Sequence, residues 1–404
     1  MPIKGPGTAA ELIVEAVACS DGLDRQALAR ELDLPMGTVT SISAGLVRSG
    51  RLVEREPERA APGRRGRPPV KLAIPGPMRT MGAVVWTEGV VRGVVCGYDG
   101  RVVQSGTFDL DPGVSVMESP GVDAALALAA GRDLGPGHDV AVPDRIVVSV
   151  PAPYQAGIGI PWASPLDDTA ERPQFGPWLR SDPAARLGER LGVAVRIENN
   201  ANLGALGEHR FGAGRDHRDL IYIKMGQRSI GAGLILDGRL VRGASGFAGE
   251  LAHIHIDDDG PFCVCGSRGC LSRRLGQTIV DAVQPAYDEP VNFATIRGLA
   301  ASGETGPMRV LKDLGRTIGR PLADLCTFLN PSAVLLDASL GAAGVPIADG
   351  IRDQIEAYAA PAAAAAVQVL PGALDDADAW GAVQLGRSEA LRRLYPARHG
   401  EAGR

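Results

Sequence analysis

The sequence predicts an α/β protein in which a small helical N-terminal domain precedes a large region of alternating strands and helices. The chain has 404 residues, which is enough for two or three domains with buried cores. The first fifty residues carry apolar residues at helical spacing, whereas strands rich in valine and isoleucine begin after Arg79. We therefore expect one domain over residues 1–75 and a second region over residues 76–404.

The composition excludes several classes of protein. Hydrophobic residues make up 45% and charged residues 22%, which is ordinary for a globular protein and argues against a disordered or fibrous chain. The net charge of −5 excludes a uniformly basic, histone-like binder. The basic excess lies at the N-terminus, where residues 1–72 hold 11 lysines and arginines against 9 aspartates and glutamates.

No segment has the pattern of a signal peptide or a membrane span. Glu11 and Glu15 interrupt the apolar stretch near the start of the chain. Residues 146–166 lack charge, but four prolines break them, at positions 151, 153, 161 and 165. We expect a cytoplasmic protein without a membrane partner.

Three helices are predicted in the N-terminal domain. Apolar residues at helical spacing mark residues 9–17, and Asp24 is a suitable N-cap for a second helix over residues 25–32. A third helix carries Val39, Ile42 and Leu46 on one face and ends at Gly50. Its opposite face has small, mostly polar residues and one arginine, namely Thr38, Thr40, Ser41, Ala44 and Arg48.

A basic β-hairpin follows the third helix. Strands are predicted at residues 52–54 and 70–74, and the loop between them holds five arginines, at positions 55, 59, 64, 65 and 67. Three helices and such a wing form a winged helix-turn-helix, which binds double-stranded DNA through the third helix in the major groove. The predicted DNA contacts are Thr38, Thr40, Ser41, Arg48, Arg64, Arg65 and Arg67. The alternative is a protein-interaction module followed by a solvated linker.

The large region alternates strands and helices. The predicted strands are residues 83–86, 90–95, 101–103, 146–150, 193–197, 220–224, 233–236 and 333–336. The predicted helices are residues 124–130, 183–191 and 315–329. The two halves of this region show the same alternation of strands and helices, but no exact sequence repeat. This pattern predicts two similar lobes with a cleft.

A metal site is predicted from three clustered cysteines. Cys263, Cys265 and Cys270 lie within eight residues, and Gly266 and Gly269 lie between the last two. With an upstream histidine, either His253 or His255, they supply one imidazole and three thiolates, a set that suits structural zinc. The alternative is that the cysteines are unrelated small core residues.

Three motifs resemble the ROK family of repressors and sugar kinases. They are residues 197–202 (Ile-Glu-Asn-Asn-Ala-Asn), 249–253 (Gly-Glu-Leu-Ala-His) and 263–270 (Cys-Val-Cys-Gly-Ser-Arg-Gly-Cys). The resemblance implies a two-lobed, actin-like fold of the hexokinase type, and an N-terminal winged helix marks the repressor branch. It also selects His253 as the fourth zinc ligand.

The groups that handle phosphate in the family's kinases are altered in this sequence. Asn200 stands where the kinases have the aspartate that accepts the proton of the sugar hydroxyl, and an amide cannot do this. The first phosphate loop, Asp-x-Gly-Gly-Thr in kinases, is replaced by residues 84–88 (Val-Val-Trp-Thr-Glu). The second phosphate loop, of the type Gly-Thr-Gly-Ile-Gly in kinases, corresponds to residues 227–233 (Gln-Arg-Ser-Ile-Gly-Ala-Gly). Only the second half of the kinase pattern is kept. We therefore expect no kinase activity.

The sugar site of the family is partly retained. Asn199, Glu250 and His253 match the residues that hold sugar hydroxyls, Asn200 replaces an aspartate and Ser272 replaces a glutamate. These changes predict a different or weaker ligand, and the alternative is a vestigial pocket.

We therefore expect a transcription regulator, a homodimer or homotetramer, with an effector site at Asn199, Asn200, Glu250 and His253. A sugar kinase with an accessory domain and a regulator controlled by a partner protein are the alternatives.

Overall fold

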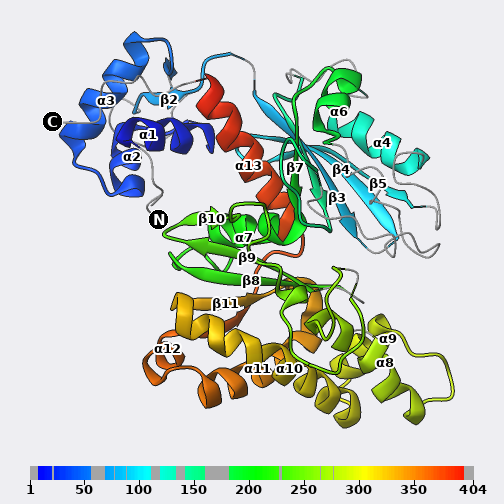
Figure 1. Cartoon of the computed structure of the whole chain (residues 1–404). Coiled ribbons are helices and arrows are strands. Elements are labelled where there is room, and N and C mark those ends of the chain that lie inside the picture. The colour runs from blue at the N-terminus through cyan, green and yellow to red at the C-terminus, as the bar shows by residue number, and fades with distance from the viewer. Residues whose placement is uncertain are drawn as a thin grey trace.

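The computed structural model describes residues 8–20, 22–55, 69–76, 78–87, 89–110, 119–132, 142–159, 182–226, 230–263, 265–275 and 277–394. They form an N-terminal module and two lobes, each built on a five-stranded sheet (Figure 1). Within these residues, no helix is long and apolar enough to cross a membrane.

The N-terminal module contains three helices and a hairpin in the predicted order. They are α1 (Ala9–Ala18), α2 (Arg25–Leu32), α3 (Met36–Arg48), β1 (Val53–Arg55) and β2 (Lys71–Ala73). The Asp24 side chain accepts a hydrogen bond from the Ala27 amide at 2.8 Å, so its predicted role as the N-cap of α2 is confirmed. The two strands pair antiparallel.

The turn between α2 and α3 is held by local polar contacts. Asp33 ends α2 in the left-handed conformation, with φ of 51°, and so lets the chain reverse before α3. The Arg25 guanidinium donates to the Ser43 hydroxyl of α3 at 3.0 Å and to Glu54 of β1 at 2.7 Å. Arg25 of α2 therefore holds α2 to both α3 and β1.

Lobe 1 is built on sheet 1, whose strand order is β5-β4-β3-β6-β7. The strands are β3 (Thr80–Thr87), β4 (Val90–Gly97), β5 (Val102–Asp109), β6 (Ile146–Val150) and β7 (Val195–Asn199). Helices α4 (Pro120–Ala129) and α6 (Ala184–Leu191) cover one face, and α13 (Ala377–Leu394) covers the other. The first three strands pair antiparallel, and β3, β6 and β7 pair parallel.

Lobe 2 repeats this topology in sheet 2, whose order is β10-β9-β8-β11-β12. The strands are β8 (Leu220–Met225), β9 (Ile230–Leu236), β10 (Arg239–Val241), β11 (Ala333–Leu336) and β12 (Gln368–Pro371). The α-helices are α7 (Asn200–Phe211), α8 (Gln277–Val283), α9 (Phe293–Ala301), α10 (Thr305–Leu329), α11 (Gly344–Tyr358) and α12 (Pro361–Ala366). The expectation of two similar α/β lobes is confirmed, because each sheet has the same strand order and the same mixture of parallel and antiparallel pairs.

The helix after the last strand of each lobe packs on the other lobe's sheet. Helix α7 follows β7 of sheet 1 and packs on β8 and β9, whereas α13 follows β12 of sheet 2 and packs on β3 and β6. The two helices lie against each other where the lobes meet (Figure 1). This exchange of helices joins the lobes.

Several predicted boundaries were wrong. The strand expected at residues 193–197 is β7, which begins at Val195 because its pairing with β6 runs from Val195 to Asn199. The strand expected at 101–103 overlaps only the start of the longer β5, and the strand expected at 233–236 is part of the longer β9. The helix expected at 315–329 begins at Thr305.

Candidate functional site

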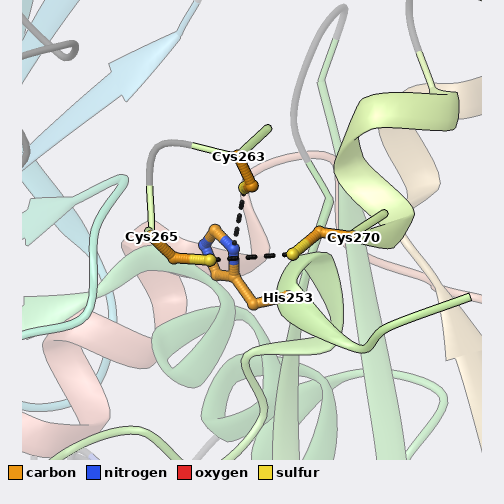
Figure 2. A group of neighbouring side chains, drawn as sticks. All are labelled: His253, Cys263, Cys265 and Cys270. Atoms are coloured by element: carbon orange, nitrogen blue, oxygen red, sulfur yellow. Dashed lines mark hydrogen bonds between the residues drawn. The ribbon is translucent and has the colours of Figure 1, made fainter. Parts of the chain in front are cut away.

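Four potential metal ligands come together beside sheet 2. His253 ends the short 3-10 helix η3 (Leu251–His253), and Cys270 immediately precedes a second one, η4 (Leu271–Arg274). The His253 Nδ1 atom lies 3.4 Å from Cys263 Sγ, and the Sγ atoms of Cys265 and Cys270 are 3.6 Å apart (Figure 2). All four ligand atoms lie within 4.8 Å of one another.

Glycines allow the tight turn that carries the cysteines. Gly266 and Gly269 have φ of 89° and 64°, which other residues rarely adopt. A Cβ atom on Gly269 would lie 1.7 Å from the Asp257 carbonyl oxygen, so only glycine fits there. The Cys263 amide donates to the Ser267 carbonyl at 2.8 Å and closes the turn.

The geometry of this cluster fits tetrahedral metal coordination. Sulfur ligands of a tetrahedral zinc lie about 3.8 Å apart, close to the Cys265–Cys270 separation. Cys263 and Cys270 are buried. His255 is not in the cluster: its side chain is 47% exposed and its Nε2 atom lies 3.6 Å from Asp258. His253 is therefore the histidine that joins the three cysteines.

The predicted effector residues Asn199 and Asn200 lie where β7 meets α7. Asn199 is the N-cap of α7, and its Oδ1 atom accepts hydrogen bonds from the amides of Ala201 and Asn202 at 2.9 and 3.1 Å. Its Nδ2 atom donates to the Ala152 carbonyl at 3.1 Å. Asn199 thus holds the start of α7 to the Ala152 segment of lobe 1. Asn200 is the first residue of α7 and is half-buried.

Strand β9 connects these asparagines to Glu250. The start of α7 packs over β9, where a Cβ on Gly233 would lie 2.4 Å from the Ala201 carbonyl oxygen. The Ala232 amide of the same strand donates to the Gly249 carbonyl at 3.0 Å. Burial raises the pKa of Glu250 to about 7. The Gly249–Glu250 segment and the start of α7 therefore share one supporting strand.

A buried carboxylate beside Asn199 was missed by the sequence analysis. The Glu198 side chain is 2% exposed, and its oxygens accept hydrogen bonds from Arg242 at 2.7 Å and from Asn202 at 3.0 Å. Glu198 belongs to sheet 1, whereas Arg242 follows β10 of sheet 2, so this ion pair joins the lobes. The sequence contains no clear signal for this pair, because β7 reads Val-Arg-Ile-Glu-Asn and mixes apolar with charged and polar residues.

A second charged cluster, also missed, lies at the carboxyl ends of the central strands. Lys224 of β8 is 3.6 Å from both Asp337 and Asp378, and Ser149 of β6 donates to Asp378 at 3.4 Å. Burial would lower the pKa of Lys224, but the two aspartates raise it above its usual value. Burial raises the pKa of Asp378, and Lys224 opposes that shift. The lysine charge is therefore already paired.

Residues in place of the first phosphate loop are part of the lobe 1 core. Val84 and Trp86 of β3 are buried, and the Trp86 indole nitrogen donates to the Ser149 carbonyl. Residues 227–229, from the second loop, and Glu88 lie outside the described residues.

A crevice of about 310 Å³ lies elsewhere in lobe 2. Its walls come from the ends of β11 and β12 and from the start of α11, and include Asp337, Gly341 and Arg352. None of the predicted effector residues lines it.

The predicted DNA contacts are only partly described. Thr40, Ser41 and Arg48 are exposed on α3, and Thr38 is half-buried. The Thr40 hydroxyl donates to the Met36 carbonyl at 2.8 Å. Met36, which is not among the predicted contacts, is 45% exposed on the same face. Arg59, Arg64, Arg65 and Arg67 lie outside the described residues.

Comparison with known proteins identifies relatives among both regulators and kinases. The chain is 32% identical to the xylose repressor of Bacillus spizizenii over 221 residues, which is 54% of this chain and 57% of the repressor. It is 29% identical to a glucokinase of Thermotoga maritima over 252 residues, which is 58% of this chain and 79% of the glucokinase. The matched part thus spans little more than half the length of the xylose repressor.

A solved structure shares the fold of nearly the whole chain. It is a ROK family transcriptional regulator described as a homologue of the Escherichia coli MLC protein. The TM-score is 0.72 at 19% identity, and the match covers 95% of this chain and 97% of the other. The likeness concerns the fold, including the N-terminal part.

The family model described as the ROK family matches residues 156–389, more than half of the chain. This stretch contains the Glu198–Asn200 segment, Glu250 and all four potential metal ligands. On that match, the chain belongs to the ROK family.

Proposed function

We propose that the chain is a DNA-binding transcriptional regulator, acting as a repressor, that responds to a sugar or a sugar derivative. The observation that carries this proposal is the exposed face of α3. This helix follows the turn after α2 and exposes Thr40, Ser41 and Arg48 to solvent. A helix with small polar residues on its exposed face fits the major groove of DNA. The name of the xylose repressor relative supports the same function.

The alternative is a sugar kinase, which the glucokinase relative supports. Three features argue against phosphoryl transfer. Asn200 cannot accept the hydroxyl proton, Trp86 and its neighbours in β3 are core residues, and Lys224 is paired with two aspartates. We propose that the lobes bind a ligand without phosphorylating it.

We propose that His253, Cys263, Cys265 and Cys270 hold one structural zinc ion. Three thiolates and one imidazole complete a tetrahedral shell and leave no position for water, as in structural rather than catalytic sites. A bound ion would hold the turn that follows Glu250.

We propose further that the protein acts as a homodimer or homotetramer on double-stranded operator DNA in the cytoplasm. A two-fold dimer binds an inverted repeat, with its half-sites separated by whole turns of the double helix. The relatives named above come from bacteria, whose DNA lies in the cytoplasm.

The experiment that tests the proposed function is sequencing of the genomic fragments that the purified protein retains. We expect enrichment of a few inverted repeats near genes for sugar uptake or use. A variant with Thr40 and Ser41 both changed to alanine should lose this enrichment. Equal recovery of all fragments by the wild-type protein would contradict the proposal. Formation of a sugar phosphate with ATP would support the kinase instead.

A further inference from the structure

Helices α7 and α13 form a backbone-to-backbone contact between the lobes. A Cβ on Gly207 of α7 would lie 2.0 Å from the Ala377 carbonyl oxygen, and a Cβ on Gly381 of α13 would lie 1.8 Å from that of Leu203. Side chains join the two helices as well, since the rings of Phe211 of α7 and Trp380 of α13 lie 5.2 Å apart between their centroids. The lobes therefore meet at one close crossing of α7 and α13, and a change in the angle between the lobes has to turn one helix on the other there. We call this crossing the hinge.

Each helix is fastened to a different lobe. Glu389 of α13 pairs with Arg145, next to β6, at 3.1 Å, so α13 moves with sheet 1. Glu208 of α7 is buried and accepts hydrogen bonds from the amides of Ala373 and Leu374, in the loop after β12, at 2.9 Å. Helix α7 therefore moves with sheet 2.

The N-terminal module sits on this crossing. Ile13 and Val17 of α1 share an apolar cluster with Val383 and Leu391 of α13, which places the module against lobe 1. Figure 1 shows α13 between the module and sheet 1. The apolar contact alone would let the module follow lobe 1.

Glu15 of α1 adds a contact to the other lobe. Its Oε1 atom accepts a hydrogen bond from Gln384 of α13 at 3.1 Å and lies 3.7 Å from the Arg210 guanidinium of α7. The side chains of Glu15 and Arg210 are 24% and 20% exposed, so water screens this pair less than a fully exposed one. Gln384 is itself held by Arg387, which is fully buried and donates to the Tyr98 carbonyl at 2.6 Å.

We infer that Glu15 is a positioning residue that binds both helices of the hinge, so that the angle between the lobes sets the orientation of α3. One carboxylate oxygen cannot keep both partners when α7 and α13 move apart or rotate. Opening of the lobes therefore breaks the contact of Glu15 with one of the two helices. This inference rests on the proposed function, because it supplies the step between ligand binding in the lobes and DNA binding by the module.

The ion pair between Arg242 and Glu198 allows a test that needs neither ligand nor DNA. It joins the lobes beside Asn199 and involves no residue of the module. Removal of Arg242 leaves the buried Glu198 without its partner from lobe 2, which favours the open lobes. The effect of this change on amide exchange in α1 then shows whether the Glu198–Arg242 pair and the Glu15 contact are coupled.

The experiment compares amide hydrogen exchange in the full chain for the wild type, Arg242→Ala, Glu15→Ala and the double variant. We expect Arg242→Ala to speed exchange in α1 several-fold when Glu15 is present and to cause no further change when Glu15 is absent. Arg239→Ala is the matched control, since Arg239 is an exposed arginine in the strand that precedes Arg242. Exchange in α10 checks that lobe 2 stays folded in each variant.

Unchanged exchange in α1 of Arg242→Ala, or equal acceleration with and without Glu15, would overturn the inference. If Arg242→Ala does not fold, Arg242→Gln takes its place. A second measurement uses the double variant Glu15→Arg with Arg210→Glu, which exchanges the two charges. Either change alone should make exchange in α1 insensitive to Arg242→Ala, and the double variant should restore the sensitivity. A merely structural role of Glu15 would change stability but would not make α1 insensitive to Arg242. Because no DNA or sugar is present, failure here leaves the proposed regulator intact.

Discussion

At the scale of the residue, the cysteine cluster could be predicted and its histidine could not be chosen from the residues alone. The three cysteines lie in one short turn, so their spacing already brings the thiols together. His253 and His255 are two residues apart, and either could reach that turn. The family resemblance selects His253, and the structure agrees, because His253 at the end of η3 joins the cysteines while His255 lies near Asp258.

Loss of one thiolate should release the metal. We expect one zinc per chain in the wild-type protein, and less than half of that in Cys265→Ser. The free energy of unfolding should fall by roughly 3 kcal/mol or more, since metal binding contributes to folding. Elemental analysis and denaturant unfolding measure the two quantities.

The control is Cys326→Ser, which changes a buried cysteine outside the cluster and should keep the zinc. Wild-type protein that contains no zinc after purification without a chelator would contradict the prediction.

Buried charges are the residues that the sequence could least predict. Glu198 depends on Arg242, and Lys224 depends on Asp337 and Asp378, and each set draws on separate elements. The residue types alone do not indicate such pairs, because a lone charged residue in a strand is usually solvent-exposed.

At the scale of the element, the exposed face of α3 was predicted correctly in its main features. Val39 and Leu46 are buried, and Thr40, Ser41 and Arg48 are exposed.

Helix α13 was not predicted, because it is covered on several sides. Val383, Leu385 and Leu391 are all buried, against the module and lobe 1. A helix covered in this way has no single apolar stripe at helical spacing.

The two exposed hydroxyls of α3, those of Thr40 and Ser41, should contribute unequally to sequence preference. The Thr40 hydroxyl donates to the Met36 carbonyl, so its proton is already used. We expect Ser41→Ala to reduce discrimination at one base pair by about 1 kcal/mol, roughly fivefold, and Thr40→Ala to have a smaller effect. Binding to operators with single base changes measures both. Equal effects would show that the Met36 contact is lost on DNA.

The basic loop should contribute affinity without specificity. Replacement of Arg64, Arg65 and Arg67 by alanine should weaken binding to all DNA sequences. It should also reduce the salt dependence by up to about 0.9 log unit for each lost phosphate contact. The control replaces three arginines on the surface of lobe 2, Arg316, Arg320 and Arg352, which changes the net charge equally. An unchanged salt slope in the loop variant would exclude phosphate contacts by these arginines.

At the scale of the whole molecule, the two lobes could be predicted but their connection could not. Alternating strands and helices indicate α/β lobes, and the cysteine and asparagine motifs indicate the family. The contact between Glu15 and Gln384 joins residues that are 369 positions apart, and neither lies in a recognisable motif. The docking of the module on the hinge follows from tertiary packing, which local sequence patterns do not record.

The proposed response to a ligand would involve the whole chain, and Glu250 provides its test. A ligand that binds the closed lobes more tightly than the open lobes shifts the population toward closure and changes the orientation of α3. We expect one compound among D-xylose, D-glucose, N-acetylglucosamine and their phosphates to lower operator affinity about tenfold. Glu250→Ala should abolish this response and leave ligand-free operator binding within about twofold of the wild type.

Glu356→Ala, an exposed change on α11, is the control and should respond as the wild type does. Fluorescence anisotropy of labelled operator at increasing ligand concentration measures all three proteins. A response that survives in Glu250→Ala would place the ligand elsewhere, and the crevice beside Asp337 is then the next site to change, through Arg352→Ala. No response of the wild type to any compound would favour a vestigial pocket, and regulation would then depend on a partner protein.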